Sequence, residues 1–208
     1  MKKGFTVIEL IVVVSIIAVI SMIIIFNHRG FNSSVTLENV SQDIALTIRK
    51  AQVSAMGVKG VDVSGSSEFP GYGVRFALPA ESNNPIWGDN KSFVYFADLP
   101  TLGGNKRYDP GLDCGNPFFE NECLDVIDIT TRDRISFLCV DGNCFDQDSA
   151  PYLDIVFSRP NPDAQFYFCI NESDCTSGFS YVSIKIESPD EQKSREISIW
   201  NTGQISVN

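Results

Sequence analysis

A single acidic residue, Glu9, stands in an otherwise apolar run that extends from Phe5 to Phe26. As a helix this run would be about 33 Å long, which is enough to cross the hydrocarbon core of a bilayer. An isolated carboxylate is costly in lipid, so an acidic residue inside such a segment is a functional candidate by default. The chemistry open to Glu9 is pairing with a positively charged group.

The segment before the run, Met1–Gly4, is short and basic because it contains Lys2 and Lys3. A secretory signal peptide normally has a shorter apolar core, followed by a small-residue cleavage site. Here the run continues into Asn27–Phe31, which offers neither such a site nor a cysteine for lipidation. A plain signal anchor would fit the length but would leave Glu9 unexplained.

The residues at the start of the run are Gly4-Phe5-Thr6-Val7-Ile8-Glu9-Leu10. With the aliphatic run behind them, they resemble the class III signal of type IV pilins and type II secretion pseudopilins. The resemblance implies that a prepilin peptidase cleaves between Gly4 and Phe5 and methylates the new amino terminus of Phe5. It also implies that Glu9 pairs with the Phe5 amine of a neighbouring subunit, because two groups that are costly alone in an apolar filament core offset each other there.

The six cysteines form three close pairs in the second half of the chain: Cys114 and Cys123, Cys139 and Cys144, Cys169 and Cys175. Six cysteines allow fifteen connectivities, but the clustering favours local pairing, and free buried cysteines are the alternative. Each local bridge would stabilise the fold by roughly 2–3 kcal/mol and would imply an oxidising compartment. The spacing and the lone histidine, His28, support no zinc site.

Neither a catalytic motif nor a cofactor motif is visible in the sequence, so an enzyme is not expected and no cofactor is predicted. The weak candidate for a metal is an oxygen-rich loop that could attract calcium, formed by Asp141, Asn143, Asp146 and Asp148. This loop lacks the glycine and terminal glutamate of an EF-hand, and a solvated turn is the favoured interpretation.

Apolar residues recur at helical spacing after the membrane segment and predict a helix over Ser34–Met56 with one buried stripe: Leu37, Val40, Ile44, Ile48, Ala51 and Ala55. Asn27–Ser34 is predicted to be pliant, and Gly57 and Gly60 to end the helix. Alternating and aromatic-rich segments then predict strands over Gly71–Phe76, Ser92–Asp98, Leu124–Thr130, Arg134–Val140, Tyr152–Ser158, Phe166–Ile170, Phe179–Glu187, Arg195–Trp200 and Gln204–Asn208.

The predicted fold is α+β and pilin-like, with a long N-terminal helix packed on an antiparallel sheet. Its parts are a leader (1–4), a transmembrane or filament-core helix (5–26), an amphipathic helix (27–57) and a β-rich head with stapled loops (58–208). Three segments resemble the H-type minor pseudopilins and FimT-like minor pilins (the GspH/FimT family): the helix end Ile48–Ala55, the strand Gly71-Tyr72-Gly73-Val74-Arg75-Phe76, and the C-terminal Thr202-Gly203-Gln204-Ile205-Ser206-Val207.

The resemblance implies a non-enzymatic minor subunit that helps to initiate a filament or sits near its tip. Its partners would be other pilins, the prepilin peptidase, the inner-membrane assembly platform and the membrane, which the chain would cross once with an extracytoplasmic head. Two alternatives stay open: a DNA-uptake minor pilin and a membrane-anchored extracytoplasmic enzyme. The formal net charge of -10 disfavours nucleic acid, whose affinity depends on neutralising phosphates.

Overall fold

The computed structural model describes residues 4, 6–57, 59–63, 66–78, 89–102, 104–110, 114, 122–170 and 174–208, with the backbone alone for 24–32. Its contacts divide the chain into two compact units, residues 1–36 and 37–208, and the second is called the head here. Helix α1 (Val7–Met56) contributes to both units. The helix is continuous through residues 27–34, where the sequence predicted a pliant segment.

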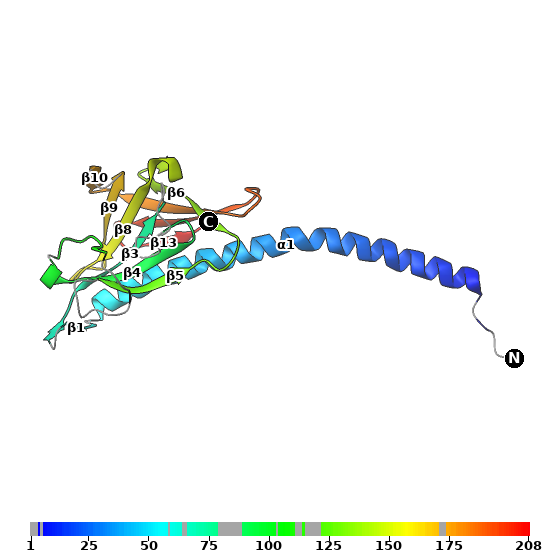
Figure 1. The fold of residues 1–208 in the computed structure, drawn as a ribbon, viewed down its shortest axis with the longest axis horizontal. Coiled ribbons are helices and arrows are strands. Elements are labelled where there is room, and N and C mark those ends of the chain that lie inside the picture. The colour runs from blue at the N-terminus through cyan, green and yellow to red at the C-terminus, as the bar shows by residue number, and fades with distance from the viewer. Residues whose placement is uncertain are drawn as a thin grey trace. The chain divides into compact units, whose positions relative to one another are not determined.

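Two antiparallel sheets make up most of the head, and Figure 1 shows them beside the last turns of α1. The larger sheet has the order β10-β9-β8-β3-β4-β5. Its strands are β3 (Gly71–Ala77), β4 (Ser92–Asp98), β5 (Cys123–Asp128), β8 (Pro151–Phe157), β9 (Ala164–Ile170) and β10 (Asp174–Ser177). Its centre joins distant segments, because Val74 lies opposite Tyr95 on β4 and opposite Ile155 on β8.

The second sheet has the order β13-β12-β11-β6-β7. Its strands are β6 (Arg134–Val140), β7 (Asn143–Phe145), β11 (Tyr181–Glu187), β12 (Ser194–Trp200) and β13 (Ile205–Val207). A small hairpin of β1 (Val61–Val63) and β2 (Ser66–Glu68) follows α1, and two short 3-10 turns, η2 (Pro100–Leu102) and η3 (Gln147–Ser149), interrupt the loops. The sequence predicted one sheet and did not predict β1, β2, β7 or β10.

The main core of the head lies where α1 and both sheets meet. All six residues of the predicted stripe are buried there, and Ile44, Ile48 and Ala51 are fully inaccessible. The larger sheet contributes alternate residues such as Leu153 and Ile155, and the second sheet contributes residues such as Ile184. The α+β class and the core-facing stripe are therefore confirmed.

A second, smaller cluster lies on the other face of the larger sheet. Its buried members are Val94, Phe96, Tyr108, Cys123 and Val156. Tyr108 belongs to the connection between β4 and β5, so this connection covers the outer face of the sheet. Both faces of β3, β4 and β8 are buried as a result, and their burial patterns are almost continuous.

Among the described residues, no helix has both the length and the apolar character of a membrane-crossing segment. The predicted span from Phe5 to Phe26 falls partly outside those residues, because Phe5 and the side chains of 24–26 are not among them.

Candidate functional site

The N-terminal site is built at the first turn of α1. Thr6 precedes the helix, and Glu9 lies three residues later. The Glu9 Oε2 atom accepts hydrogen bonds from the Thr6 backbone N–H at 3.3 Å and from the Thr6 hydroxyl at 3.2 Å, and the Glu9 N–H donates to Thr6 Oγ1 at 3.4 Å. This reciprocal arrangement is a capping box, which satisfies backbone donors that a helix start otherwise leaves free.

The capping box fixes where the Glu9 carboxylate points. It is directed toward the helix start, where the helix dipole also favours a negative charge, and both Thr6 and Glu9 are exposed in this chain. Gly4 is exposed as well, whereas the other half of the predicted cleavage site, Phe5, lies outside the described residues. Thr6 is a functional residue that the sequence did not single out, although the Thr-x-x-Glu spacing before an apolar run is a signal for it.

The six cysteines form three disulfides: Cys114–Cys123, Cys139–Cys144 and Cys169–Cys175. This is the local pairing that the clustering favoured. Two of the bridges cross between directly opposed residues of neighbouring strands, Cys139 with Cys144 on β6 and β7, and Cys169 with Cys175 on β9 and β10.

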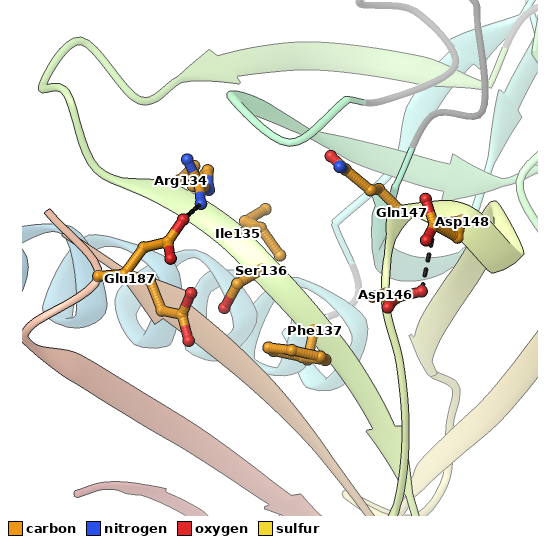
Figure 2. A pocket seen from close by; sticks show the side chains of 9 residues that line it. Arg134, Ile135, Ser136, Phe137, Asp146, Gln147, Asp148 and Glu187 are labelled. Carbon is orange, nitrogen blue, oxygen red and sulfur yellow. Dashed lines mark hydrogen bonds and ion pairs between the residues drawn. The ribbon is translucent and has the colours of Figure 1, made fainter. Parts of the chain in front are cut away.

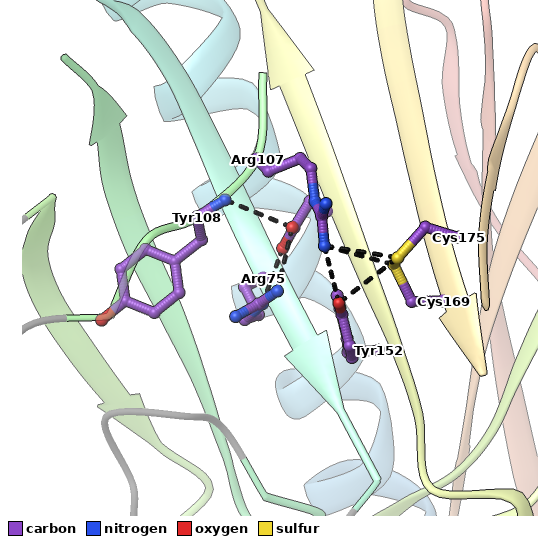
Figure 3. The surroundings of a disulfide bond; sticks show 7 residues. Arg75, Arg107, Tyr108, Tyr152, Cys169 and Cys175 are labelled. Carbon is purple, nitrogen blue, oxygen red and sulfur yellow. Dashed lines mark hydrogen bonds and ion pairs between the residues drawn. A yellow bond between two sulfur atoms is a disulfide. The ribbon is translucent and has the colours of Figure 1, made fainter. Parts of the chain in front are cut away.

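A buried polar cluster lies on the outer face of the larger sheet, and Figure 3 shows it. Arg75 of β3 binds Asp154 of β8 through two hydrogen bonds, 2.8 Å from Nε to Oδ1 and 3.1 Å from Nη2 to Oδ2, and Asp154 is fully buried. The Arg75 guanidinium also stacks over the Tyr152 ring, 4.2 Å from its centroid. The Tyr108 N–H donates to Asp154 Oδ2 at 3.2 Å, so the ion pair holds the covering loop against the sheet.

Two more buried carboxylates hold the same loop. Glu122 accepts the Leu99 N–H at 2.9 Å on one oxygen and the Asp109 N–H at 2.8 Å on the other, and Asp98 accepts the Lys106 N–H at 3.2 Å. Burial raises the pKa of Glu122 to about 8, because desolvation disfavours the charged form more than these N–H groups favour it. Burial also raises the pKa of Asp98.

The weak calcium candidate is not assembled as a site. Asp141 Oδ1 accepts the N–H groups of Ser180 and Tyr181 at 3.0 and 3.1 Å, and Asp146 Oδ1 accepts the Asp148 N–H at 3.2 Å. Asn143 is exposed on β7. Within the described part of the chain, no three His, Cys, Asp or Glu side chains are grouped to hold a metal ion. Asp141 and Asp146 instead accept backbone N–H groups, and these hydrogen bonds hold the hairpin turn and the η3 turn.

A pocket of about 390 Å³ opens beside the first half of β6 (Figure 2). Its walls are Arg134–Phe137, Asp146–Asp148, Glu187 and Glu191. Arg134 is bound to Glu191 at 2.5 Å, and Glu187 pairs with Lys185 at 3.0 Å. Arg134 and Lys185 thus pair with two of the four acidic side chains that line this groove, and the other two are Asp146 and Asp148.

Comparison with known proteins bears on the N-terminal site alone. Residues 1–25 match the prokaryotic N-terminal methylation motif. No curated protein and no solved structure matches the chain. The motif supports a type IV pilin-like or pseudopilin-like subunit that a prepilin peptidase processes and that assembles with other pilins. It points to a structural subunit anchored in a membrane, with its head outside the cytoplasm, and away from an enzyme.

Proposed function

We propose that this chain is a minor pilin or pseudopilin of the H type, which helps to initiate a short filament or sits at its tip. In this proposal residues 1–4 are a cytoplasmic leader, and the helix from Phe5 to Phe26 crosses the inner membrane once before it enters the filament core. Residues 27–57 carry the head on an amphipathic helix, and residues 58–208 form a pilin-like head with stapled loops. The assembly platform in the inner membrane would be a further partner.

The observation that carries the proposal is the methylation motif at residues 1–25 together with the position of Glu9. Once cleavage has occurred after Gly4, the new amine of Phe5 is one residue from Thr6. Thr6 is the residue that binds the Glu9 carboxylate at 3.2 Å. A carboxylate held at the helix start is therefore suited to receive the amine of a neighbouring subunit, and the pair would set the axial register between subunits.

The assignment to a minor, H-type subunit is supported by the head. The strand that contains Gly73 and the C-terminal hairpin around Gly203 both resemble the sequence pattern of that subfamily. The loops closed by disulfides in the head also favour a minor subunit. A low-copy role predicts that sheared filaments, analysed by quantitative mass spectrometry, contain this chain at a small fraction of the main subunit. Equal amounts would indicate a main pilin instead.

Processing is tested by co-expressing the full chain with a prepilin peptidase and measuring its intact mass. The expected product lacks Met1–Gly4 and carries one added methyl group on Phe5. A Gly4→Val variant should stay unprocessed beside it, because the bulky side chain blocks the cleavage position. If the parent chain keeps its leader while a control pilin is cleaved, the proposed maturation is wrong.

The role of Glu9 is tested with three variants, because capping and ion pairing are separable. Glu9→Gln keeps the capping acceptor and loses the charge, Glu9→Ala loses both, and Thr6→Ala loses the hydroxyl but keeps the charge. We expect both Glu9 variants to be cleaved normally but to enter filaments poorly, and Thr6→Ala to assemble. Normal assembly of Glu9→Gln would show that the carboxylate only caps the helix.

A further inference from the structure

Two of the disulfides are alike in construction but differ in their surroundings. Cys139–Cys144 and Cys169–Cys175 each bridge opposed residues of two neighbouring antiparallel strands. Each also has one buried partner, Cys139 or Cys169, and one more accessible partner, Cys144 or Cys175. The two bridges can therefore be compared within one molecule, although Cys144 is exposed and Cys175 is half-buried.

Arg107 lies beside the Cys169–Cys175 bridge, as Figure 3 shows. Its Nη2 lies 3.3 Å from Cys175 Sγ and 3.6 Å from Cys169 Sγ. The same nitrogen donates to the Tyr152 hydroxyl at 2.8 Å, and that oxygen is 3.5 Å from Cys175 Sγ. Tyr152 is the direct neighbour of Cys169 across β8 and β9. A guanidinium and a phenol thus converge on one disulfide.

A buried carboxylate lies on the same side of the sheet and has its own partner. Asp154 lies on the same face of β8 as Tyr152, and Arg75 holds it through two hydrogen bonds. The Arg107 guanidinium contacts the two sulfur atoms, the Tyr152 hydroxyl and the Tyr167 ring, whose centroid is 5.5 Å from its Cζ. A positive charge at a disulfide stabilises the thiolate that forms when the bond breaks.

We propose that Cys169–Cys175 is a thiol–disulfide exchange site for a dithiol protein or small dithiol, with Arg107 stabilising the leaving thiolate. The thiolate of the dithiol attacks Cys175 Sγ, the accessible sulfur, because Cys169 is fully buried. The S–S bond breaks, a mixed disulfide forms with Cys175, and Cys169 leaves as a thiolate beside Arg107. The second thiol of the partner then loses its proton and attacks the mixed disulfide. Cys175 is released, and the partner departs oxidised with two electrons transferred to the pair.

The reverse sequence oxidises the two thiols, so the site can be closed or opened by partners of opposite redox state. Reduction removes the covalent link between β9 and the edge strand β10, which contributes only four residues to the sheet. The Cys139–Cys144 bridge has no guanidinium contact among the described residues. It closes a tight turn at Asp141 and Gly142 and is expected to stay oxidised for longer.

The test measures how fast each disulfide of the full-length chain in detergent micelles is reduced by dithiothreitol under native conditions. Newly exposed thiols are trapped with an alkylating reagent at timed intervals and assigned by peptide mass spectrometry. In the parent chain Cys169–Cys175 should open faster than Cys139–Cys144. Arg107→Gln should slow the opening of Cys169–Cys175 by about threefold to tenfold, Arg107→Lys should retain part of the rate, and Cys139–Cys144 should not change.

The sign of the effect separates chemistry from damage to the fold. If Arg107 only holds the covering loop in place, its loss exposes the disulfide and speeds the reduction, which would overturn the proposal. Equal rates in parent and Arg107→Gln would overturn it as well. Arg159→Gln is the control for loss of an arginine, because the exposed Arg159 donates to the Phe69 carbonyl and makes no contact with a disulfide sulfur among the described residues.

Discussion

Replacing Gly73 with alanine should destabilise the head, because the sheet has no room for an added methyl group. Gly73 is at the centre of β3, between Phe96 on β4 and Val156 on β8. A Cβ atom there would lie 2.5 Å from Phe96 Cζ and 2.7 Å from the Ile155 carbonyl oxygen. The ring cannot retreat easily, because it packs against Tyr108 with 5.2 Å between centroids, and the carbonyl belongs to a central strand.

The magnitude follows from two opposed effects. Overpacking of a buried site costs about 2–3 kcal/mol, whereas alanine lowers the entropy of the unfolded chain relative to glycine and returns about 0.5–1 kcal/mol. The free energy of unfolding should therefore fall by about 1–2.5 kcal/mol. For a unit of this size the midpoint of thermal unfolding should drop by roughly 2–10 °C.

The assay is thermal and urea unfolding of the full chain in detergent, followed by near-ultraviolet circular dichroism. Gly60→Ala is the control, because its new Cβ would come nearest to the ring edge of Phe69, at 3.2 Å, and would lie 3.5 Å from the Glu68 carbonyl oxygen. Phe69 is half exposed and can move. Adding Phe96→Leu to Gly73→Ala should recover part of the loss, since one of the two obstacles is removed. Equal stability of Gly73→Ala and Gly60→Ala would refute the steric argument.

Three further outcomes are expected, each measured by the same unfolding assay. Ile44→Asp should lower the free energy of unfolding by several kcal/mol because it buries an unpaired charge. Leu46→Asp, at a position 65% exposed, should lower it by less than about 1 kcal/mol. Similar losses in the two variants would contradict the burial of the stripe. Asp154→Asn should cost about 3–5 kcal/mol, because it leaves Arg75 buried without its partner, and an unchanged midpoint would contradict this. The folded-state pKa of Glu122 is raised to about 8, so the folded state holds this proton more tightly than the unfolded state does. The free energy of unfolding should therefore fall as pH rises from about 4.5 to 8. Glu122→Gln should flatten this slope, and an unchanged slope would show that another group causes it.

Local patterns were enough to predict the helix and most strands. The buried stripe of α1 follows from the 3.6-residue period, which needs no knowledge of the partner. Strand limits differed by one or two residues, for example Leu124–Thr130 against Cys123–Asp128 and Phe179–Glu187 against Tyr181–Glu187. Such differences reflect where hydrogen-bonded pairing stops, which depends on the neighbouring strand.

What could not be predicted depends on contacts between distant segments. Alternation shows that a strand has two faces, but not that β3 lies between β4 and β8, nor that the strands divide into two sheets. Arg75 illustrates the consequence. In sequence it is a charged residue on the face opposite to Val74, and the simplest prediction is exposure, yet it is buried because Tyr108 and its loop cover that face.

The three disulfides differ in the structure that surrounds each of them. Cys114–Cys123 ends at the first residue of β5, directly after Glu122, whose carboxylate binds the amides of Leu99 and Asp109. The bridge and these hydrogen bonds therefore close the same loop, so cleaving this bridge should loosen the loop without removing the carboxylates that hold it. Cys139–Cys144 fastens a hairpin tip, where a local bridge mainly restricts the unfolded chain. At Cys169–Cys175 a cation contacts both sulfur atoms, so reactivity has to be considered for this bridge as well as stability.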